Sequence, residues 1–421
     1  MEIERIPVAE LADDLAAEWD ALRPAQSTVS SPFYSSGYAR MVAAERPNVE
    51  AGVVRVHGRL KAVMAYERSG RSAIPAGGGI TDFQGPVTAA IASTTGDLQE
   101  AVESPIDELT PNAWLRGLRL HQWRFRYVPP IWKPLAPYRF FRMSAPYVDL
   151  SDGFATFKAA IDARGSDMMH RHKRGCRTFA KRLGPVRFDF DNQEPALLER
   201  FLAWKAAQHA ERGTRFAFAE PWARRLVERA FASRDPAFRG TLSCLFAGDH
   251  FVAGSFNLIS GTTLHVWIAA FGPEYSKFSP GTNFFPELIM AAGAAGIQRL
   301  DFGHGDEPFK YRFGTCLDEV AEGCVDRRLL LGWATRSSYA IRDRLRQTEL
   351  RQWIQKARQT TRLWGTRLGL TSSLPASDTV HEAASDSARE SDQDPAKVAA
   401  TAAMGLADSR SSQSLELNGS E

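Results

Sequence analysis

The sequence predicts an α/β protein made of two copies of one unit, each with a mixed central sheet flanked by helices. A helix–helix–hairpin order occurs near the start of the chain and again in its second half. Residues 264–302 follow the order strand, loop, helix, strand, which is typical of α/β folds. The chain has 421 residues, of which 44% are hydrophobic, so it can fill two cores.

The first copy of the unit begins the chain. Leu11, Leu15, Trp19 and Leu22 form one apolar stripe, which predicts an amphipathic helix. His57-Gly58-Arg59 separates two β-rich runs and predicts a hairpin turn. The expected elements are a strand at 2–6, helices at 8–22 and 37–45, and hairpin strands at 51–56 and 60–66.

The second copy repeats this order. Trp204 stands where Trp19 stands in the first copy, and Gly248 takes the place of Gly58. The matching elements are helices at 197–208 and 221–232 and hairpin strands at 241–246 and 251–259. Duplication of one unit is the economical explanation for such a repeat.

Two segments between the copies each have two interpretations. The glycine-rich stretch 76–86 is either a phosphate loop or an irregular turn that shapes an acceptor cleft. The lack of a helix pattern directly after it favours the turn. Residues 123–127 alternate aromatic and arginine side chains, which favours a strand with one buried and one wet face over a surface that stacks nucleobases.

A basic helix is predicted at 166–183. One face carries Met168, His172, Cys176, Phe179 and Leu183. The opposite, basic face is either simply solvated or contacts phosphates. His170 and His172 point to different sides of a helix, and the four cysteines show no C-x-x-C spacing, so neither a metal site nor a disulfide framework is expected.

The stretch 265–315 is the candidate centre of function. After a predicted strand at 264–271, a helix begins with Ser279, Pro280, Gly281, Thr282 and Asn283. Backbone N–H groups at a helix start bind anions such as phosphate, although the same residues would also cap a purely structural helix. A short strand at 300–302 and a polar turn follow, and they supply Asp301, His304, Glu307 and Lys310.

These motifs together resemble a known superfamily. Four features resemble the GNAT acyltransferases. They are the run SPGTN, the helix after it, the stretch LDFGHGDEPFKYRFGT, and the basic helix ending in LGPVRFDF. Within that superfamily, the sequence resembles most the branch of cellulose-biosynthesis (CelD/BcsL-type) acetyltransferases. This branch is in turn similar to the Fem peptidyltransferases. The likeness spans about 145–324. It departs from the usual Arg/Gln-x-x-Gly-x-Gly/Ala phosphate loop, which is reduced here to residues 277–281.

The resemblance implies tandem GNAT-like domains, at 1–150 and 151–332, and transfer of an acyl group, acetyl in the simplest case, from coenzyme A to an amine. A small-molecule or glycan amine is the implied acceptor, in exopolysaccharide or cell-envelope biosynthesis. Residues 279–283 would hold acyl-CoA, Lys310 would stabilise charge at the acyl group, and no metal is implied. An amine with a pKa near 10.4 needs about 4.6 kcal/mol to lose its proton at pH 7, so Asp301, His304 or Glu307 would act as the base.

Two alternatives remain open. The first is a Fem-like ligase that uses aminoacyl-tRNA, the one case in which a nucleic-acid partner is expected. The second is a non-catalytic scaffold of a polysaccharide synthase. Neither a serine nor a cysteine nucleophile is supported, because G-x-S-x-G is absent from the sequence.

The C-terminal part has a different character. A basic amphipathic helix is predicted within 333–370, and its positions 336–367 suit either an anionic membrane surface or packing on the body of the protein. Residues 371–421 carry nine acidic and three basic residues without aromatics, and we expect them to be disordered. The N-terminus has no apolar signal core, so the expected location is cytoplasmic, at most peripheral at the inner membrane face.

Overall fold

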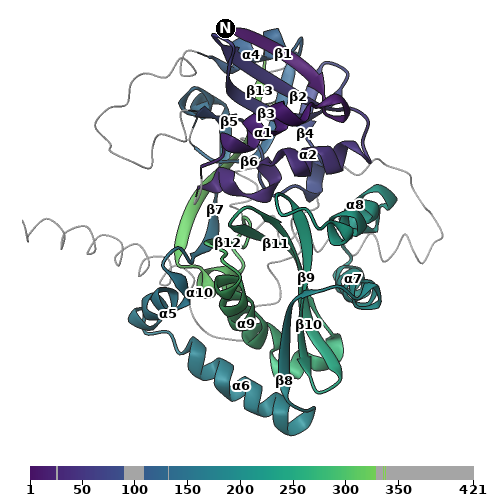
Figure 1. The fold of residues 1–421 in the computed structure, drawn as a ribbon, viewed down its shortest axis with the longest axis vertical. Helices are drawn as coiled ribbons and strands as arrows, with labels where there is room; N and C mark the ends of the chain where they lie inside the picture. Colours follow the sequence, from purple (N-terminus) through teal and green to yellow (C-terminus); the bar gives the residue numbers. More distant parts are fainter. Residues whose placement is uncertain (25–26, 90–108, 131, 329–334, 336, 338–421) are drawn as a thin grey trace, which may run out of the picture.

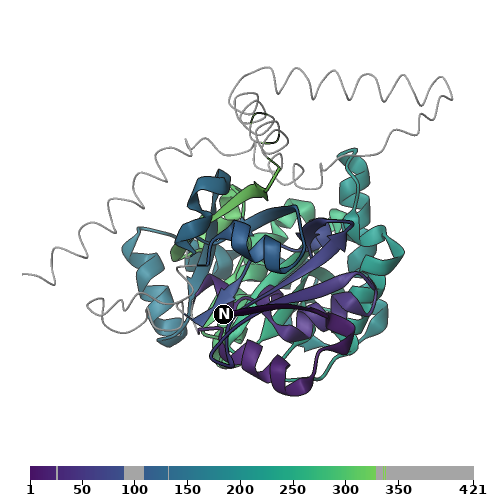
Figure 2. The same cartoon turned by 90° about the horizontal axis from the view of Figure 1, so that it is seen from above.

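The polypeptide folds around one mixed β-sheet that runs through both halves of the chain (Figure 1). The computed structural model describes residues 1–24, 27–89, 109–130, 132–328, 335 and 337. Helices lie on both sides of this sheet (Figures 1 and 2), which confirms the predicted α/β class. The acidic tail, and the basic helix of 333–370 apart from residues 335 and 337, lie outside the described residues.

The N-terminal half follows the predicted order of elements. Its strands are β1 (Glu2–Pro7), β2 (Val49–Val56), β3 (Arg59–Ser69), β4 (Ser72–Pro75), β5 (Val87–Thr88), β6 (Gln122–Val128) and β7 (Arg139–Asp149). Its α-helices are α1 (Asp13–Ala21), α2 (Ser36–Ala43) and α4 (Pro111–Gly117). The β2–β3 hairpin turns at His57 and Gly58, with φ of 51° and 75°, the geometry that suits a two-residue hairpin.

One expected helix is shorter than predicted. The stretch 8–22 is a single-turn 3-10 helix at Val8–Glu10, an extended step, and then α1. Val8 and Leu11 are 1% and 7% exposed, so the break lets both reach the core. The α-helix starts only at Asp13, where acidic side chains favour a helix N-terminus.

The C-terminal half has the same kinds of element. Its helices are α5 (Gly153–Ala163), α6 (Met168–Arg182), α7 (Pro195–Glu211), α8 (Pro221–Ala232), α9 (Pro280–Ala294) and α10 (Pro308–Phe313). Its strands are β8 (Val186–Asn192), β9 (Arg239–Ala247), β10 (His250–Ser260), β11 (Thr263–Phe271), β12 (Arg299–Asp301) and β13 (Cys316–Asp326). The predicted basic helix, hairpin and central strand–helix–strand are all present within this half.

The sheet has the same strand order when read inward from either edge. One edge runs β1-β2-β3-β4-β6 and the other β8-β9-β10-β11-β12. In both runs all neighbouring strands are antiparallel except the innermost pair, which is parallel. This parallel pair is β4 with β6 in the first run and β11 with β12 in the second. This correspondence confirms the duplicated unit.

The two halves exchange their last strands at the centre of the sheet. β13 lies between β6 and β7, while β7 lies between β13 and β12. Cutting the chain between the halves would therefore leave strand edges without their partners. The boundaries expected for two domains, near residues 150 and 332, stay a prediction.

The hydrophobic cores follow this arrangement. One core joins the halves, with Trp19, Tyr38, Phe201, Phe238 and Trp267 among its members. A second core fills the C-terminal half beneath α5, α6 and α9, and a third fills the N-terminal half beneath α4. Residues 123–127 form the predicted strand with one buried face, since the aromatic residues Trp123, Phe125 and Tyr127 are 4%, 0% and 1% exposed.

Candidate functional site

The parallel strands β11 and β12 separate at the middle of the molecule. They pair only from Thr263 with Arg299 to His265 with Asp301, and β11 then continues to Phe271. On its other side, the register between β11 and β10 shifts at Phe256 and Asn257, opposite Trp267. Such a bulge turns the backbone of β11 at the point where the two strands part.

A tight turn follows β12 at this opening. Gly303 and Gly305 have φ of 71° and 123°, which L side chains rarely adopt. A Cβ at Gly305 would lie 2.4 Å from Oε2 of Glu307, and one at Gly303 would lie 2.7 Å from Oδ2 of Asp82. Glycine is therefore needed at both positions for the turn to bring its side chains together.

Lys310 lies in the first turn of α10, directly after this polar turn. Its Nζ donates a hydrogen bond to the carbonyl oxygen of His304 and lies 3.0 Å from Oε2 of Glu307. Lys310 is only 7% exposed. A buried ammonium group in such a setting acts more strongly on a neighbouring charge than it would in water.

The N-terminal half contributes a carboxylate to this turn. Oδ2 of Asp82 lies 2.9 Å from Nε2 of His265, and Oδ1 of Asp82 lies 3.9 Å from Nδ1 of His304. The ring of His304 stacks on that of Tyr127, with centroids 3.4 Å apart. Two histidines of the C-terminal half thus meet one aspartate of the N-terminal half.

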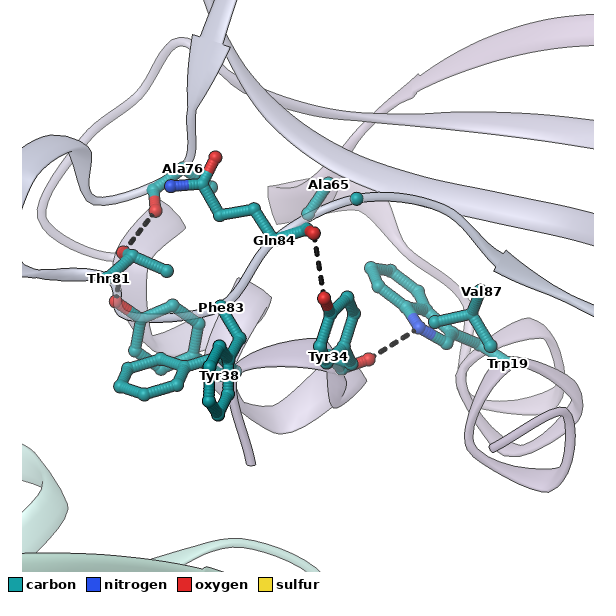
Figure 3. A pocket seen from close by; sticks show the side chains of 11 residues that line it. Trp19, Tyr34, Tyr38, Ala65, Ala76, Thr81, Phe83, Gln84 and Val87 are labelled. Carbon is teal, nitrogen blue, oxygen red and sulfur yellow. Dashed lines mark hydrogen bonds between the residues drawn. The ribbon is translucent and has the colours of Figure 1, made fainter. Parts of the chain in front are cut away.

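The glycine-rich stretch that carries Asp82 lines a small pocket together with Trp19, Tyr34 and Tyr38 (Figure 3). Thr81 donates to the carbonyl oxygen of Ala76, and Tyr34 donates to that of Gln84, as Figure 3 shows. Phe83 is fully buried between these contacts. The stretch therefore forms an irregular turn after β4, in agreement with the prediction, with this small pocket beside it.

Asp301 lies close by but is engaged elsewhere. Its Oδ1 is 2.8 Å from Nη2 of Arg299, and the same nitrogen is 2.6 Å from Oδ2 of Asp318. The Arg299 guanidinium also lies 3.6 Å from the centroid of the Tyr147 ring. Asp301 is 1% exposed, so in this state its carboxylate belongs to a buried ion-pair network. Of the predicted catalytic residues, the structure thus brings Lys310 and His304 together and ties Asp301 to Arg299.

A residue that the sequence did not reveal also approaches the site. Lys205 of α7 donates from Nζ to the carbonyl oxygen of Ala269 on β11, at 2.9 Å. Burial, and secondarily the positive charges of Arg212 and Lys310, lower the pKa of Lys205 to about 8. In the sequence, Lys205 only stands at helical spacing with Leu198, Phe201 and Leu202, so its packing on β11 is what identifies it.

The predicted cofactor residues stand at the start of α9. Ser279 is exposed and adopts a left-handed conformation, with φ of 50° and ψ of 58°, and its side chain makes no capping hydrogen bond. Pro280 is buried as the first residue of α9, and the N–H of Thr282 donates to the carbonyl oxygen of Ser279. No atom lies within 4 Å of the point where a Cβ on Gly281 would be. A phosphate could therefore approach the backbone here.

Asn283 points away from this open position. It is 1% exposed, and a Cβ on Gly175 of α6 would lie 2.0 Å from its Oδ1. The Asn283 amide nitrogen makes long contacts, 3.4 and 3.5 Å, to the carbonyl oxygens of Ser279 and Phe278. Asn283 therefore supports the loop from the α6 side.

One family model matches part of the chain. Residues 166–311 match the model of the acetyltransferase (GNAT) domain, which includes α9, the polar turn and Lys310. No curated protein matches the sequence. The match supports the superfamily, and the cellulose-biosynthesis branch stays a prediction. Among the helices of the described residues, none is both long and apolar enough to cross a bilayer.

Solved structures with similar folds cover both halves. FemX is 10% identical, with 80% of this chain and 100% of FemX covered and a TM-score of 0.50. The C-terminal domain of a putative lysylphosphatidylglycerol synthetase from Agrobacterium fabrum is 14% identical, with 76% and 93% covered and a TM-score of 0.46. A tandem GNAT protein from the clavulanic acid biosynthesis pathway is 11% identical, with 77% and 99% covered and a TM-score of 0.40. At this identity the likeness to FemX concerns the fold alone.

Proposed function

We propose that this protein is an N-acyltransferase that moves an acyl group, acetyl in the simplest case, from coenzyme A to an amine acceptor. The observation that carries the proposal is the buried ammonium of Lys310, held in the polar turn after β12 by the carbonyl oxygen of His304 and the carboxylate of Glu307. The family match over 166–311 supports the same class of reaction.

The start of α9 would bind the phosphates of the acyl donor. A phosphate accepts hydrogen bonds from the N–H groups of a helix start, and the open space at Gly281 fits that approach. The acyl thioester would then extend toward the gap between the diverging strands. The bulge at Trp267, the residue of β11 without a partner on β10 in the strand register, turns β11 backbone groups at this gap.

Lys310 and His304 have different tasks in this proposal. As the acceptor nitrogen bonds to the carbonyl carbon, negative charge grows on the carbonyl oxygen, and Lys310 stabilises it. His304 takes the proton that the amine must lose, and the negative charge of Asp82, 3.9 Å from Nδ1, stabilises the imidazolium that forms. The C–S bond then breaks, coenzyme A leaves as a thiolate, and the proton taken up by His304 passes to its sulfur. Asp301 keeps Arg299 and β12 in place.

The acceptor would approach from the side of the N-terminal half, which supplies Asp82 and Tyr127 to the site. An amino sugar, free or within an exopolysaccharide or envelope glycan, is the acceptor class that we propose. A cytoplasmic location, with the basic segment 336–367 on an anionic membrane surface, would bring the site to such an acceptor.

A second candidate is a Fem-like ligase that uses aminoacyl-tRNA. It is favoured by the exposed basic side chains on α6, which suit a polyanion: Arg171, Lys173, Arg174, Arg177, Lys181 and Arg182. The same lysine and histidine would then act on an ester in place of a thioester.

Isothermal titration of the full-length protein with acetyl-CoA and, separately, with charged tRNA tests the proposal. We expect acetyl-CoA to bind, and Gly281→Val to weaken its binding by at least about tenfold. Binding of charged tRNA alone would favour the ligase. If neither donor binds, a non-catalytic scaffold of a polysaccharide synthase becomes the better description.

A further inference from the structure

Helices α6 and α9 pack side by side in the C-terminal half, on the face of the sheet opposite α7 and α8 (Figure 1). His172 and Cys176 are four residues apart on α6, so both side chains point from the same helix face. That face lies against Glu287, one turn after Asn283 on α9. Three side chains that can each ligate a metal therefore meet between the two helices.

The distances among these groups are close to those of a metal site. Nε2 of His172 lies 3.0 Å from Oε1 of Glu287 and 3.8 Å from Sγ of Cys176, and one ligand atom of each residue lies within 4.8 Å of the others. In tetrahedral zinc sites the bonds are about 2.0–2.3 Å long, so neighbouring ligand atoms stand roughly 3.3–3.6 Å apart. Sγ of Cys176 is also 3.7 Å from Nδ1 of His172, so the imidazole ring and the thiol would have to turn toward each other for all three groups to reach this geometry.

We propose that His172, Cys176 and Glu287 bind a zinc ion that ties α6 to α9. The donor set of one thiolate, one imidazole and one carboxylate suits Zn²⁺ better than Mg²⁺ or Ca²⁺, which prefer oxygen alone. His172 is 6% exposed, while Cys176 and Glu287 are partly exposed, which leaves an entry path and room for a water as fourth ligand. The ion would also offset the negative charge that the thiolate and carboxylate bring into this interface.

The contacts of His172 also suit an imidazolium. Burial lowers the pKa of His172, but its contacts with Cys176 and Glu287 outweigh burial and raise that pKa. Metal binding to a histidine generally displaces a proton. A plain imidazolium–carboxylate ion pair is the competing explanation for the cluster.

A zinc ion here would act on the neighbouring cofactor loop. Gly175 lies between His172 and Cys176 on the contact face of α6 and touches Asn283, which supports the start of α9. Phe179, one turn further along α6, lies 5.4 Å from Phe278 of the loop, between ring centroids. Fixing α6 on α9 would therefore hold the donor site in shape.

The test uses the full-length protein stripped with a chelator and then titrated with ZnCl₂. We expect about one tightly bound zinc ion per chain and a higher melting temperature than in chelator, because a ligand that binds only the folded state stabilises it. His172→Gln and Cys176→Ser should each weaken the binding by at least about 100-fold. Cys316→Ser is the matched control, since Cys316 is also partly exposed but lies outside the cluster.

Cobalt provides a second readout that does not depend on the variants folding equally well. Wild-type protein and Cys316→Ser loaded with Co²⁺ should show thiolate-to-metal charge-transfer absorption, and Cys176→Ser should not. Two results would overturn the proposal in favour of the ion pair. The first is that wild-type protein binds zinc no more tightly than Cys176→Ser does. The second is that wild-type protein loaded with cobalt shows no thiolate-to-metal band.

Discussion

The carboxylate of Asp82 joins His265 across the boundary between the two halves, with 2.9 Å between Oδ2 and Nε2. His265 has no exposed surface, and its ring also contacts those of Phe33 and Phe83 edge-on. The other carboxylate oxygen of Asp82 faces His304. The geometry of the proposed base thus depends on a loop from the opposite half of the chain.

Asp82→Asn should lower turnover. The Asp82 carboxylate lies 3.9 Å from Nδ1 of His304, so its negative charge stabilises the imidazolium that forms when His304 accepts a proton. The check is kcat with an identified acceptor. Asp306→Asn, an exposed aspartate in the same turn, is the control, and unchanged turnover in Asp82→Asn would contradict the role of Asp82.

Lys310→Ala should preserve the affinity for the acyl donor and lower turnover by about 10²–10³. The reason is that an ammonium beside the developing oxyanion acts mainly in the transition state. Kinetics and donor titration on the same preparation separate the two quantities. Lys158→Ala, which removes an exposed lysine of α5, controls for loss of charge alone. Near-wild-type turnover in Lys310→Ala would exclude the proposed role.

Gly281→Val should raise the dissociation constant of the donor while the protein still folds. The open space around this position accepts a larger side chain, but that side chain would occupy the approach path of a phosphate. The measurement is donor titration together with a melting curve. Gly293→Ala, near the other end of α9, tests whether any added side chain on the helix has the same effect. Equal donor affinity in wild type and Gly281→Val would place the cofactor elsewhere.

Lys205→Met should stabilise the protein at neutral pH. The pKa of Lys205 falls from 10.5 to about 8 on folding, so its charge costs stability below pH 8, and this cost disappears as pH rises toward 10.5. After allowance for the lost hydrogen bond to Ala269, we expect a gain on the order of 1–2 kcal/mol at pH 7. Urea unfolding of wild type and Lys205→Met at pH 7 and near pH 10.5 measures the difference in the free energy of unfolding at each pH. A gain that does not shrink with pH would show that burial of the charge is not its cause.

Gly175→Ala should loosen the contact between α6 and α9. The new methyl group would collide with the Asn283 amide, and overpacking of this kind costs about 1–3 kcal/mol. Asn283→Ala removes the obstructing amide, so the double variant should recover much of the loss. Urea unfolding of the two single variants and the double variant measures the coupling. Additive losses in the double variant would mean that the two residues do not press on each other.

The sequence by itself determined the local elements. β11 and α9 lie close to where apolar periodicity predicts them, and the alternation of Trp123 to Tyr127 predicts a strand with one buried face, because these patterns record which side of an element meets the core. The repeated order also predicts the duplicated unit. One prediction, a continuous helix over 8–22, was wrong, since burial of Leu11 interrupts it.

Only the tertiary structure decided which distant residues meet. Periodicity says nothing about the partner of a strand, so the exchange of β7 and β13 between the halves could not be predicted. The contact of Asp82 with His265 depends on how the two halves meet. The contacts of Lys205 with Ala269 and of Glu287 with His172 depend on how the helices pack. Each joins residues far apart in the chain, and the chemistry of a site depends on such distances in space rather than on local spacing.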